Sequence, residues 1–331
     1  MKKSISVLLS VILLLTLSFP ALAKTQYLYP SSVINRSDFS VVAHRGLNSL
    51  APENTLAAFE LAGQYGFWGC EFDIYPTTDG YWAVMHDPTV DRMTNGSGAI
   101  MNMTFKELQK LRIDRGTNIK KYPDERIPEL SQVLDICSKY GMHPVIEIKG
   151  GNAEEIKTLC SQLLKREDSN SFIFTSFSSE TLKTVRSEMK KARIWLLAFG
   201  VSDFDIALCK AYGFECLDTN YALTTQSDVE KIRSNGLVSG VWTLDSAADM
   251  ERFYSYGTRI ATTNGVLPIS KPQTTSPPVT SPQTTSPQTT SPQTTSPQGD
   301  LSQHLSQENK VMLKIVYSEA EKLVGLYRKM F

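Results

Sequence analysis

The sequence lacks an excess of charge of either sign. Its 331 residues include 34 lysines and arginines and 34 aspartates and glutamates, so the formal net charge at pH 7 is zero. Proteins that bind nucleic acid or an anionic membrane through a broad surface usually carry a basic excess, which is absent here. We therefore expect no nucleic-acid partner, and any anionic substrate must be recognised by a few local groups.

Cysteine is scarce. The sequence has 5 cysteines, an odd number, and no Cys-x-x-Cys spacing. This pattern argues against a disulfide framework and against a zinc site, and we expect most of these cysteines to be small core residues. Cys209 and Cys216 flank a single helix-to-strand turn, so a disulfide between them and two free thiols both stay open.

The N-terminal apolar run is shorter than the stretch of about 20 apolar residues that a membrane-spanning helix needs. It extends from about Ile5 to Phe19, after Met1-Lys2-Lys3 and before Ala21-Leu22-Ala23. A charged, an apolar and a small-residue section in this order are typical of a secretory signal peptide. We predict that residues 1–23 are a signal peptide and that the protein is secreted or held at the cell surface. A retained membrane anchor is the alternative.

The C-terminal part has no pattern that could add to a core. Residues 272–300 repeat Thr-Thr-Ser-Pro-Gln without apolar periodicity, which predicts an extended, semi-rigid linker. Residues 301–331 place apolar side chains at three- and four-residue steps, which predicts a single amphipathic helix. Because a lone helix is marginal in water, this one either docks on a surface or partner or is a poorly ordered tail.

Short apolar runs alternate with amphipathic helical stretches between residues 39 and 268. Such alternation is typical of βα units, and glycines that follow several of the helices supply left-handed caps. Eight strands with helices between most of them predict an α/β fold, a (β/α)8 TIM barrel. We expect a strand-like excursion at 81–87 and a short insertion at 89–128. The eight predicted strands are 41–43, 70–74, 145–148, 172–175, 194–198, 216–218, 238–243 and 260–262.

Polar residues stand at the C-terminal ends of these runs, where barrel active sites lie. His44 ends the first run, and His86 ends the excursion. Glu71 and Asp73 are two residues apart, so on a strand both carboxylates project from one face and repel each other. A cation would stabilise such a pair, and oxygen ligands favour Ca²⁺ or Mg²⁺.

A second strand repeats this two-residue spacing. Glu147 and Lys149 share one face of the apolar run 145–148. They add a third carboxylate and a fixed cation to the predicted site. A single histidine such as His86, followed by Asp-Pro, would more often be a turn residue, so the set as a whole carries the prediction.

The order of these motifs resembles the glycerophosphodiester phosphodiesterase family. The family's HRG, PENT, ExD, HD and ExK patterns occur here at residues 44–46, 52–55, 71–73, 86–87 and 147–149. The resemblance implies metal-dependent hydrolysis of a small-molecule or cell-envelope glycerophosphodiester to sn-glycerol 3-phosphate and an alcohol. Hydrolysis of polymeric glycerol phosphate (teichoic acid) or of lysophospholipid stays open as an alternative. So does a catalytically silent surface module that binds a phosphorylated ligand.

The resemblance also implies roles for individual residues. His44 and His86 would be the acid–base pair, in an order that the sequence leaves open. One divalent cation, Ca²⁺ or Mg²⁺, would be bound by Glu71, Asp73 and Glu147. Arg45 and Lys149 would complete the anion site.

Four further positions carry expectations. Trp242 corresponds to an aromatic residue that lines the family's glycerol pocket, although a core position is equally open. Glu53 and Asn54 are expected to cap a helix that begins after Pro52 and to brace the His44 loop. The family usually ends its last strand with Thr-Asp, whereas this chain has Thr263-Asn264, and we expect the lost charge to hold Arg45 less firmly.

Overall fold

The computed structural model describes residues 36–267. The predicted signal peptide, linker and C-terminal helix lie outside the described residues, at 1–23, 272–300 and 301–331. In the part that the structure describes, no helix is both long enough and apolar enough to cross a membrane.

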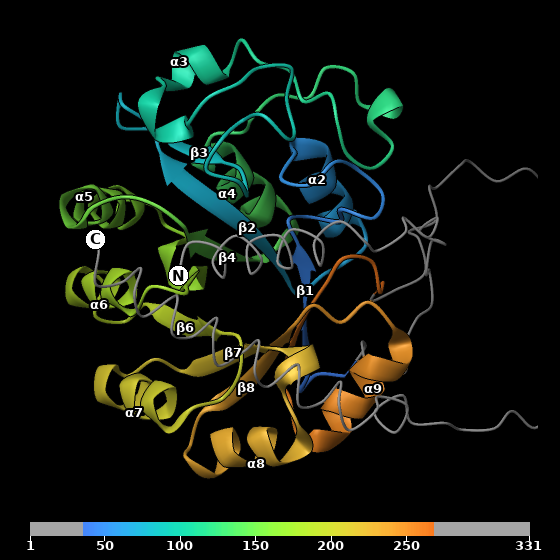
Figure 1. Ribbon diagram of the computed structural model, residues 1–331, viewed down its shortest axis with the longest axis vertical. Helices are drawn as coiled ribbons and strands as arrows, with labels where there is room; N and C mark the ends of the chain where they lie inside the picture. The colour runs from blue at the N-terminus through green and yellow to red at the C-terminus, as the bar shows by residue number, and fades with distance from the viewer. Residues whose placement is uncertain (1–35, 268–331) are drawn as a thin grey trace, which may run out of the picture. The chain divides into compact units, whose positions relative to one another are not determined.

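Eight parallel strands close into a barrel, because β1 pairs with β2 on one side and with β9 on the other (Figure 1). The prediction of a TIM barrel is confirmed, and each predicted strand is present with small shifts at its ends. The barrel strands are β1 (Ser40–His44), β2 (Gly69–Pro76), β4 (His143–Ile148), β5 (Ile173–Ser176), β6 (Arg193–Ala198), β7 (Cys216–Asn220), β8 (Val238–Trp242) and β9 (Ile260–Thr263).

Helices surround the barrel and pack on its outer face (Figure 1). Most begin at a serine or threonine whose hydroxyl accepts a hydrogen bond from the first turn, and three end at glycines with positive φ, namely Gly141, Gly213 and Gly257. These three caps match the sequence prediction. The helices are α2 (Leu56–Gln64), α4 (Leu130–Tyr140), α5 (Ala153–Leu163), α6 (Ser179–Glu188), α7 (Asp203–Tyr212), α8 (Gln226–Ser234) and α9 (Ala247–Tyr256).

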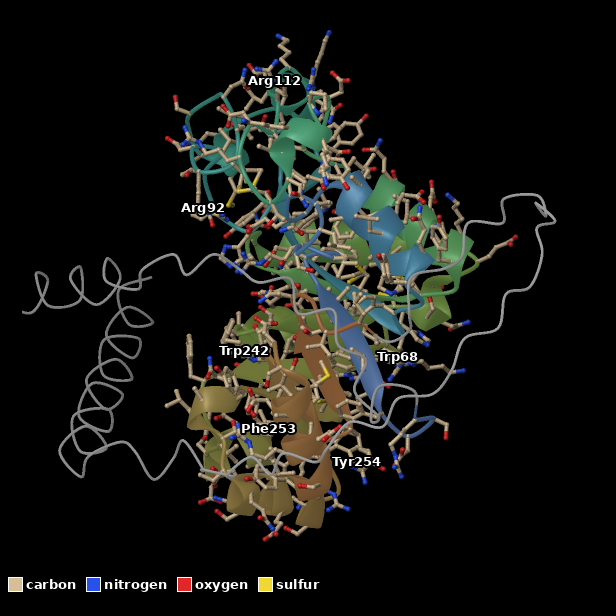
Figure 2. All side chains as sticks on the ribbon, turned by 90° about the vertical axis from the view of Figure 1, so that its right-hand side faces the viewer. Trp68, Arg92, Arg112, Trp242, Phe253 and Tyr254 are labelled. Carbon is tan, nitrogen blue, oxygen red and sulfur yellow. The ribbon has the colours of Figure 1, made fainter. Side chains whose placement is uncertain are left out.

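Alternation along the strands separates two faces. On β2, Cys70, Phe72 and Ile74 belong to the large core between sheet and helices, whereas Glu71 and Asp73 face the barrel interior. A small apolar plug fills the barrel below these carboxylates and leaves its C-terminal end open. The plug consists of Val42, Val145, Ile173, Trp195, Cys216 and Ile260. Figure 2 shows Trp68, just before β2, and Trp242, at the end of β8, on opposite sides of the barrel.

The predicted excursion is β3 (Trp82–Val84), which pairs antiparallel with β2. The segment that follows contains the short helix α3 (Phe105–Leu108) and lies at the top of Figure 1. Its apolar residues form a second buried cluster together with Tyr75, Ala83 and Met85. The insertion is therefore held by its own small core against β2 and β3.

All five cysteines are buried and free. Cys209 packs in the outer core, whereas Cys216 belongs to the plug inside the barrel. The two thiols lie on opposite faces of the sheet, so the disulfide considered between them does not form.

Candidate active site

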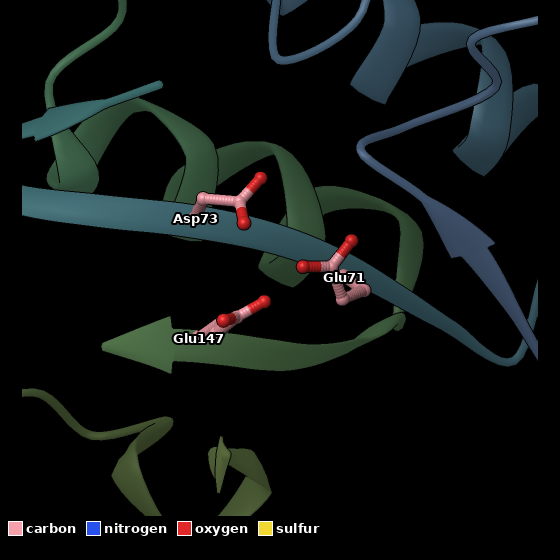
Figure 3. Close-up of side chains that lie close together, drawn as sticks. All are labelled: Glu71, Asp73 and Glu147. Carbon is pink, nitrogen blue, oxygen red and sulfur yellow. The ribbon is translucent and has the colours of Figure 1, made fainter. Parts of the chain in front are cut away.

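Three carboxylates converge on the inner face of the barrel (Figure 3). Glu71 and Asp73 project from β2, and Glu147 projects from β4 in register with Asp73. One oxygen of each lies within 4.8 Å of the others. The predicted convergence is thus present, and these residues could hold a metal ion.

The electrostatics of the cluster favour a cation. Burial and the charges of its neighbours raise the pKa of Glu71 well above its usual value, and burial together with Asp73 raises the pKa of Glu147 to about 8. Burial alone would also raise the pKa of Asp73, but Lys149 and Arg45 hold it below the usual value. Asp73 Oδ1 makes no hydrogen bond within residues 36–267, although Lys149 Nζ lies 3.3 Å from it. A set of three converging carboxylates with oxygen ligands fits a hard divalent cation.

His44 ends β1, and a series of side-chain hydrogen bonds through Asn264, just after the last strand, fixes its ring. Its Nδ1 lies 2.7 Å from Asn264 Oδ1, and Asn264 Nδ2 donates to Asp245 Oδ2 at 2.6 Å. Because a carboxylate only accepts, the amide oxygen of Asn264 must face His44. His44 Nδ1 therefore carries a hydrogen. Its Nε2 faces Glu71 Oε2 at 3.9 Å, and burial together with the charge of Arg45 lowers the pKa of His44 to about 4.

This arrangement corrects one expectation. We expected the replacement of aspartate by Asn264 to loosen Arg45. Instead, Asn264 contacts His44 and Asn48, while Arg45 Nη1 donates to Glu53 at 3.0 Å. The pairing of Asn264 with Asp245 lies beyond what the linear sequence indicates, because it joins two loops 19 residues apart.

His86 follows β3 and meets a carboxylate instead of an amide. Its Nδ1 lies 2.7 Å from Asp87 Oδ1, and Arg92 donates to both oxygens of Asp87, at 2.5 and 3.1 Å. Partial burial would raise the pKa of Asp87, but hydrogen bonds from Arg92 and His86 lower it to about 2. Asp87 is therefore an anion beside His86.

Arg92 was not predicted from the sequence, although it lies only five residues after the HD motif at 86–87. Besides Asp87, it donates to Glu53 Oε1 at 2.6 Å, and Glu53 also accepts from Arg45. Figure 2 shows Arg92 on the inserted segment. Through Glu53 and Asp87 it links the loop after β1 with the loop after β3.

The predicted helix caps are wrong in detail. The cap of α2 is Thr55, whose hydroxyl accepts from the Ala58 amide, and the helix starts at Leu56. Asn54 instead donates to Asp73 Oδ2 at 2.9 Å, and its backbone N–H donates to the Arg45 carbonyl. Arg45 and Asn54 both have positive φ and lie at the two ends of the loop that separates β1 from α2, and in this loop the Asn54 side chain faces Asp73.

The two basic residues flank the carboxylates. Lys149 Nζ lies 3.3 Å from both Asp73 Oδ1 and Glu147 Oε1, and Arg45 Nε lies 3.6 Å from Asp73 Oδ2. Both side chains also line the pocket, where they leave positive charge for an anion.

One pocket brings most of the predicted residues together. Trp242 lines it and is not part of the core, and its ring meets Phe177 and Phe199 edge-on. Asp73 adjoins the pocket through Lys149, and Glu53 and Asn54 support it from behind. The catalytic roles of these residues stay predictions. The predicted residues that line the pocket are His44, Arg45, Glu71, His86, Glu147, Lys149 and Trp242.

Asp218 is a buried acid that sequence reasoning also missed. It lines the pocket from β7 with 4% of its surface exposed, and burial raises its pKa to about 8. Its Oδ1 has no hydrogen-bond partner among the described residues. An unsatisfied buried polar group costs about 1–3 kcal/mol, so this carboxyl is retained at a cost to stability.

The pKa of Asp218 predicts a pH-dependent stability. The ordinary value is 3.8 and the folded value is about 8, so unfolding releases a proton in this interval and the free energy of unfolding falls as pH rises through it. Asp218→Asn cannot ionise and should be more stable than the wild type by a few kcal/mol near pH 8, on the order of 1.36 kcal/mol per pKa unit. Urea unfolding in weak acid and in weak base measures this. Equal stability changes for Asp218→Asn and the exposed control Asp124→Asn would contradict it.

Comparison with known proteins agrees with this geometry. The profile of the Glycerophosphoryl diester phosphodiesterase family matches residues 44–266. A glycerophosphodiester phosphodiesterase of Caldanaerobacter subterraneus is 35% identical over 226 residues, which are 66% of this chain and 90% of the relative. One from Bacillus subtilis is 31% identical over 245 residues, covering 67% of this chain and 82% of the relative.

A solved structure is also similar. It is a phosphodiesterase of Oleispira antarctica in complex with the product sn-glycerol-3-phosphate, with a TM-score of 0.64 and 25% identity over 68% of this chain and 92% of that one. The family profile spans most of the described barrel and includes every motif of the candidate site. The chain therefore belongs to the glycerophosphoryl diester phosphodiesterase family and is an enzyme of that class.

Proposed function

We propose that the chain is an exported, metal-dependent enzyme that hydrolyses glycerophosphodiesters to sn-glycerol 3-phosphate and an alcohol. The observation that carries the proposal is the convergence of His44, His86 and the three-carboxylate cluster at the open end of the barrel. The product bound to the Oleispira antarctica neighbour supports the same substrate class.

Ca²⁺ or Mg²⁺ would be held by Glu71, Asp73 and Glu147 and would supply positive charge against the phosphate oxygens. Ca²⁺ and Mg²⁺ share this oxygen chemistry, and their separate addition to the metal-free protein decides between them. Arg45 and Lys149 add fixed positive charge from two sides of the carboxylate cluster. Together these groups bind the phosphodiester and stabilise the charge that develops on it.

His44 begins as the base. With its Nδ1 hydrogen committed to Asn264, its Nε2 lone pair accepts the proton of the glycerol hydroxyl next to the ester, which attacks phosphorus. His86, whose Nδ1 contacts Asp87, acts as the acid and gives a proton to the departing alcohol oxygen. The products of this step are a cyclic phosphate and the alcohol. Water then opens the ring, with His86 as base and His44 as acid.

The proposed substrate-binding role of Lys149 predicts a specific kinetic result. Lys149→Met should raise KM and lower kcat by about 10-fold or more while metal affinity stays near the wild-type value. Glu147→Gln, its neighbour on the same strand face, should weaken metal binding itself. Calorimetric titration of both variants with Ca²⁺ and Mg²⁺, beside steady-state kinetics, separates the two. Equal loss of metal affinity in both would contradict the assigned roles.

Polymeric glycerol phosphate is the second candidate substrate. A second cavity adjoins the first at His44 and Arg45, and it is also lined by Arg92 and the exposed Arg115. This second cavity could accept a further anionic unit of a chain, whereas Trp242 lines the first pocket. Higher kcat/KM for a glycerol phosphate polymer than for glycerophosphocholine, reduced selectively in Arg115→Ala, would favour this candidate.

A substrate panel tests the main proposal. Glycerol phosphate release is measured from glycerophosphocholine, glycerophosphoinositol, teichoic acid and lysophospholipid, with His44→Ala as the background. No turnover of any of them, with ligand binding intact, would favour the silent surface module instead. Export is proposed from the N-terminal pattern alone, and N-terminal sequencing of protein recovered from the culture medium tests cleavage after Ala23.

A further inference from the structure

We propose that Asp218 and Thr175 form a binding site for a polyol hydroxyl group on the floor of the active-site pocket. The ligand would be the terminal hydroxyl of the glycerol moiety. This inference rests on the proposed function and adds a group that distinguishes glycerol from other alcohols.

The fold places both residues on the pocket floor. Thr175 on β5 and Asp218 on β7 each stand two residues after a member of the apolar plug, Ile173 and Cys216 respectively. With the period of two along a strand, both side chains form the next layer toward the open end of the barrel. Both line the same pocket as His44.

Each residue presents a buried oxygen that is unpartnered in the described part of the chain. Thr175 is 1% exposed and Asp218 is 4% exposed, and neither Thr175 Oγ1 nor Asp218 Oδ1 has a hydrogen-bond partner there. The neighbouring Thr219, whose side chain leaves the opposite face, is satisfied by Gly240 and Thr224. Buried polar atoms are nearly always bonded, so two free ones that face one pocket point to a ligand.

The adjacent strand leaves room for the carboxyl group. Gly240 on β8 is the register partner of Asp218, and a Cβ at this position would lie 2.7 Å from Asp218 Oδ1. The glycine therefore admits the Asp218 side chain to the floor. Trp242, two residues later, donates from its indole to the Asp218 carbonyl at 3.2 Å and forms the wall above it.

The chemistry of the pair fits an alcohol. Burial keeps the Asp218 carboxyl protonated at neutral pH, so it offers one O–H donor and one acceptor, as the Thr175 hydroxyl does. A neutral pair does not repel a phosphate, and it offers a quaternary ammonium group no counter-charge. The glycerol hydroxyl next to the ester is needed at phosphorus, which leaves the terminal hydroxyl for the floor.

Binding of two phosphate monoesters to the metal-loaded protein tests the inference. One is sn-glycerol 3-phosphate. The other is the propanediol phosphate that keeps the hydroxyl next to the ester and lacks the terminal one. Calorimetry should show that the wild type prefers the glycerol ester by about 10-fold, and that Asp218→Leu and Thr175→Val each lose most of this preference while binding the propanediol ester within about 2-fold of the wild type.

Asp218→Asn and Thr219→Val serve as controls. Asn keeps a donor and an acceptor, so it should retain most of the preference, and Thr219→Val alters a hydroxyl on the other face and should retain all of it. Unchanged preference in Asp218→Leu and Thr175→Val, or equal weakening of both esters, overturns the inference. Normal preference without turnover of glycerophosphocholine would overturn the proposed function alone, because binding is measured apart from catalysis.

Discussion

Replacing either His44 or His86 by alanine is expected to lower kcat for glycerophosphocholine by about 10²–10⁴-fold, the usual contribution of a positioned acid or base. The loss of kcat in the double variant should be smaller than the product of the two single losses, because the two groups act in the same step. His143→Ala is the matched control. This histidine starts β4 at the closed end of the barrel, with its ring tilted against Trp68, and its loss should leave kcat unchanged.

A substrate with a better leaving group distinguishes the proposed base, His44, from the proposed acid, His86. A substrate whose alcohol is replaced by nitrophenol needs little protonation of the departing oxygen. His86→Ala should therefore recover most of its lost rate on the nitrophenyl ester, whereas His44→Ala should stay inactive because the attacking hydroxyl still needs a base. Recovery in His44→Ala and not in His86→Ala would reverse the assignment drawn from their Asn264 and Asp87 partners.

Removal of divalent cations is the second change with a large expected effect. Stripping with excess chelator should abolish turnover, and addition of Ca²⁺ or Mg²⁺ should restore it. Binding to the folded state should also raise the melting temperature, since a ligand at about 100 times its Kd stabilises by about 2.7 kcal/mol. The physical reason is that a cation relieves repulsion among Glu71, Asp73 and Glu147.

Two variants distinguish a cation bound at the carboxylate cluster from a cation that acts elsewhere on the protein. Asp73→Asn should lose both the activity and the cation-dependent rise in melting temperature, while the exposed control Asp124→Asn should keep both. Full turnover in the protein stripped of divalent cations would contradict the proposed metal dependence. A melting temperature that rises equally in wild type and Asp73→Asn would show that the cation binds elsewhere.

The barrel and the carboxylate cluster could be predicted because both rest on short-range periodicity. Glu71 and Asp73 share a face whatever the tertiary structure, and the strand pattern alone makes β2 and β4 neighbours in a barrel. Asn264 could not be placed in this way. Its contact with His44 joins residues 220 positions apart and depends on how the barrel closes.

Asp218 and Arg92 were not predicted from the sequence, for different reasons. Asp218 ends the predicted strand 216–218, which is a position typical of barrel active sites, but its burial next to Gly240 is visible only in the structure. Arg92 acts through Glu53 and Asp87, which precede it by 39 and 5 residues, so no local pattern links the three. The prediction that Glu53 and Asn54 cap the helix was wrong because Glu53 accepts from Arg45 and Asn54 donates to Asp73, while α2 begins only at Leu56.

Because the second buried cluster is separate from the main core, we expect the inserted segment to unfold at a lower temperature than the barrel. His86 directly follows Met85 of this cluster, whereas His44 and the carboxylates stand on strands of the main barrel. The smaller cluster buries fewer apolar side chains, and such units open at lower free energy than the whole fold. Gentle warming would then silence the enzyme by withdrawing one histidine while the barrel keeps its helical circular dichroism. Cooling would restore activity without refolding the barrel.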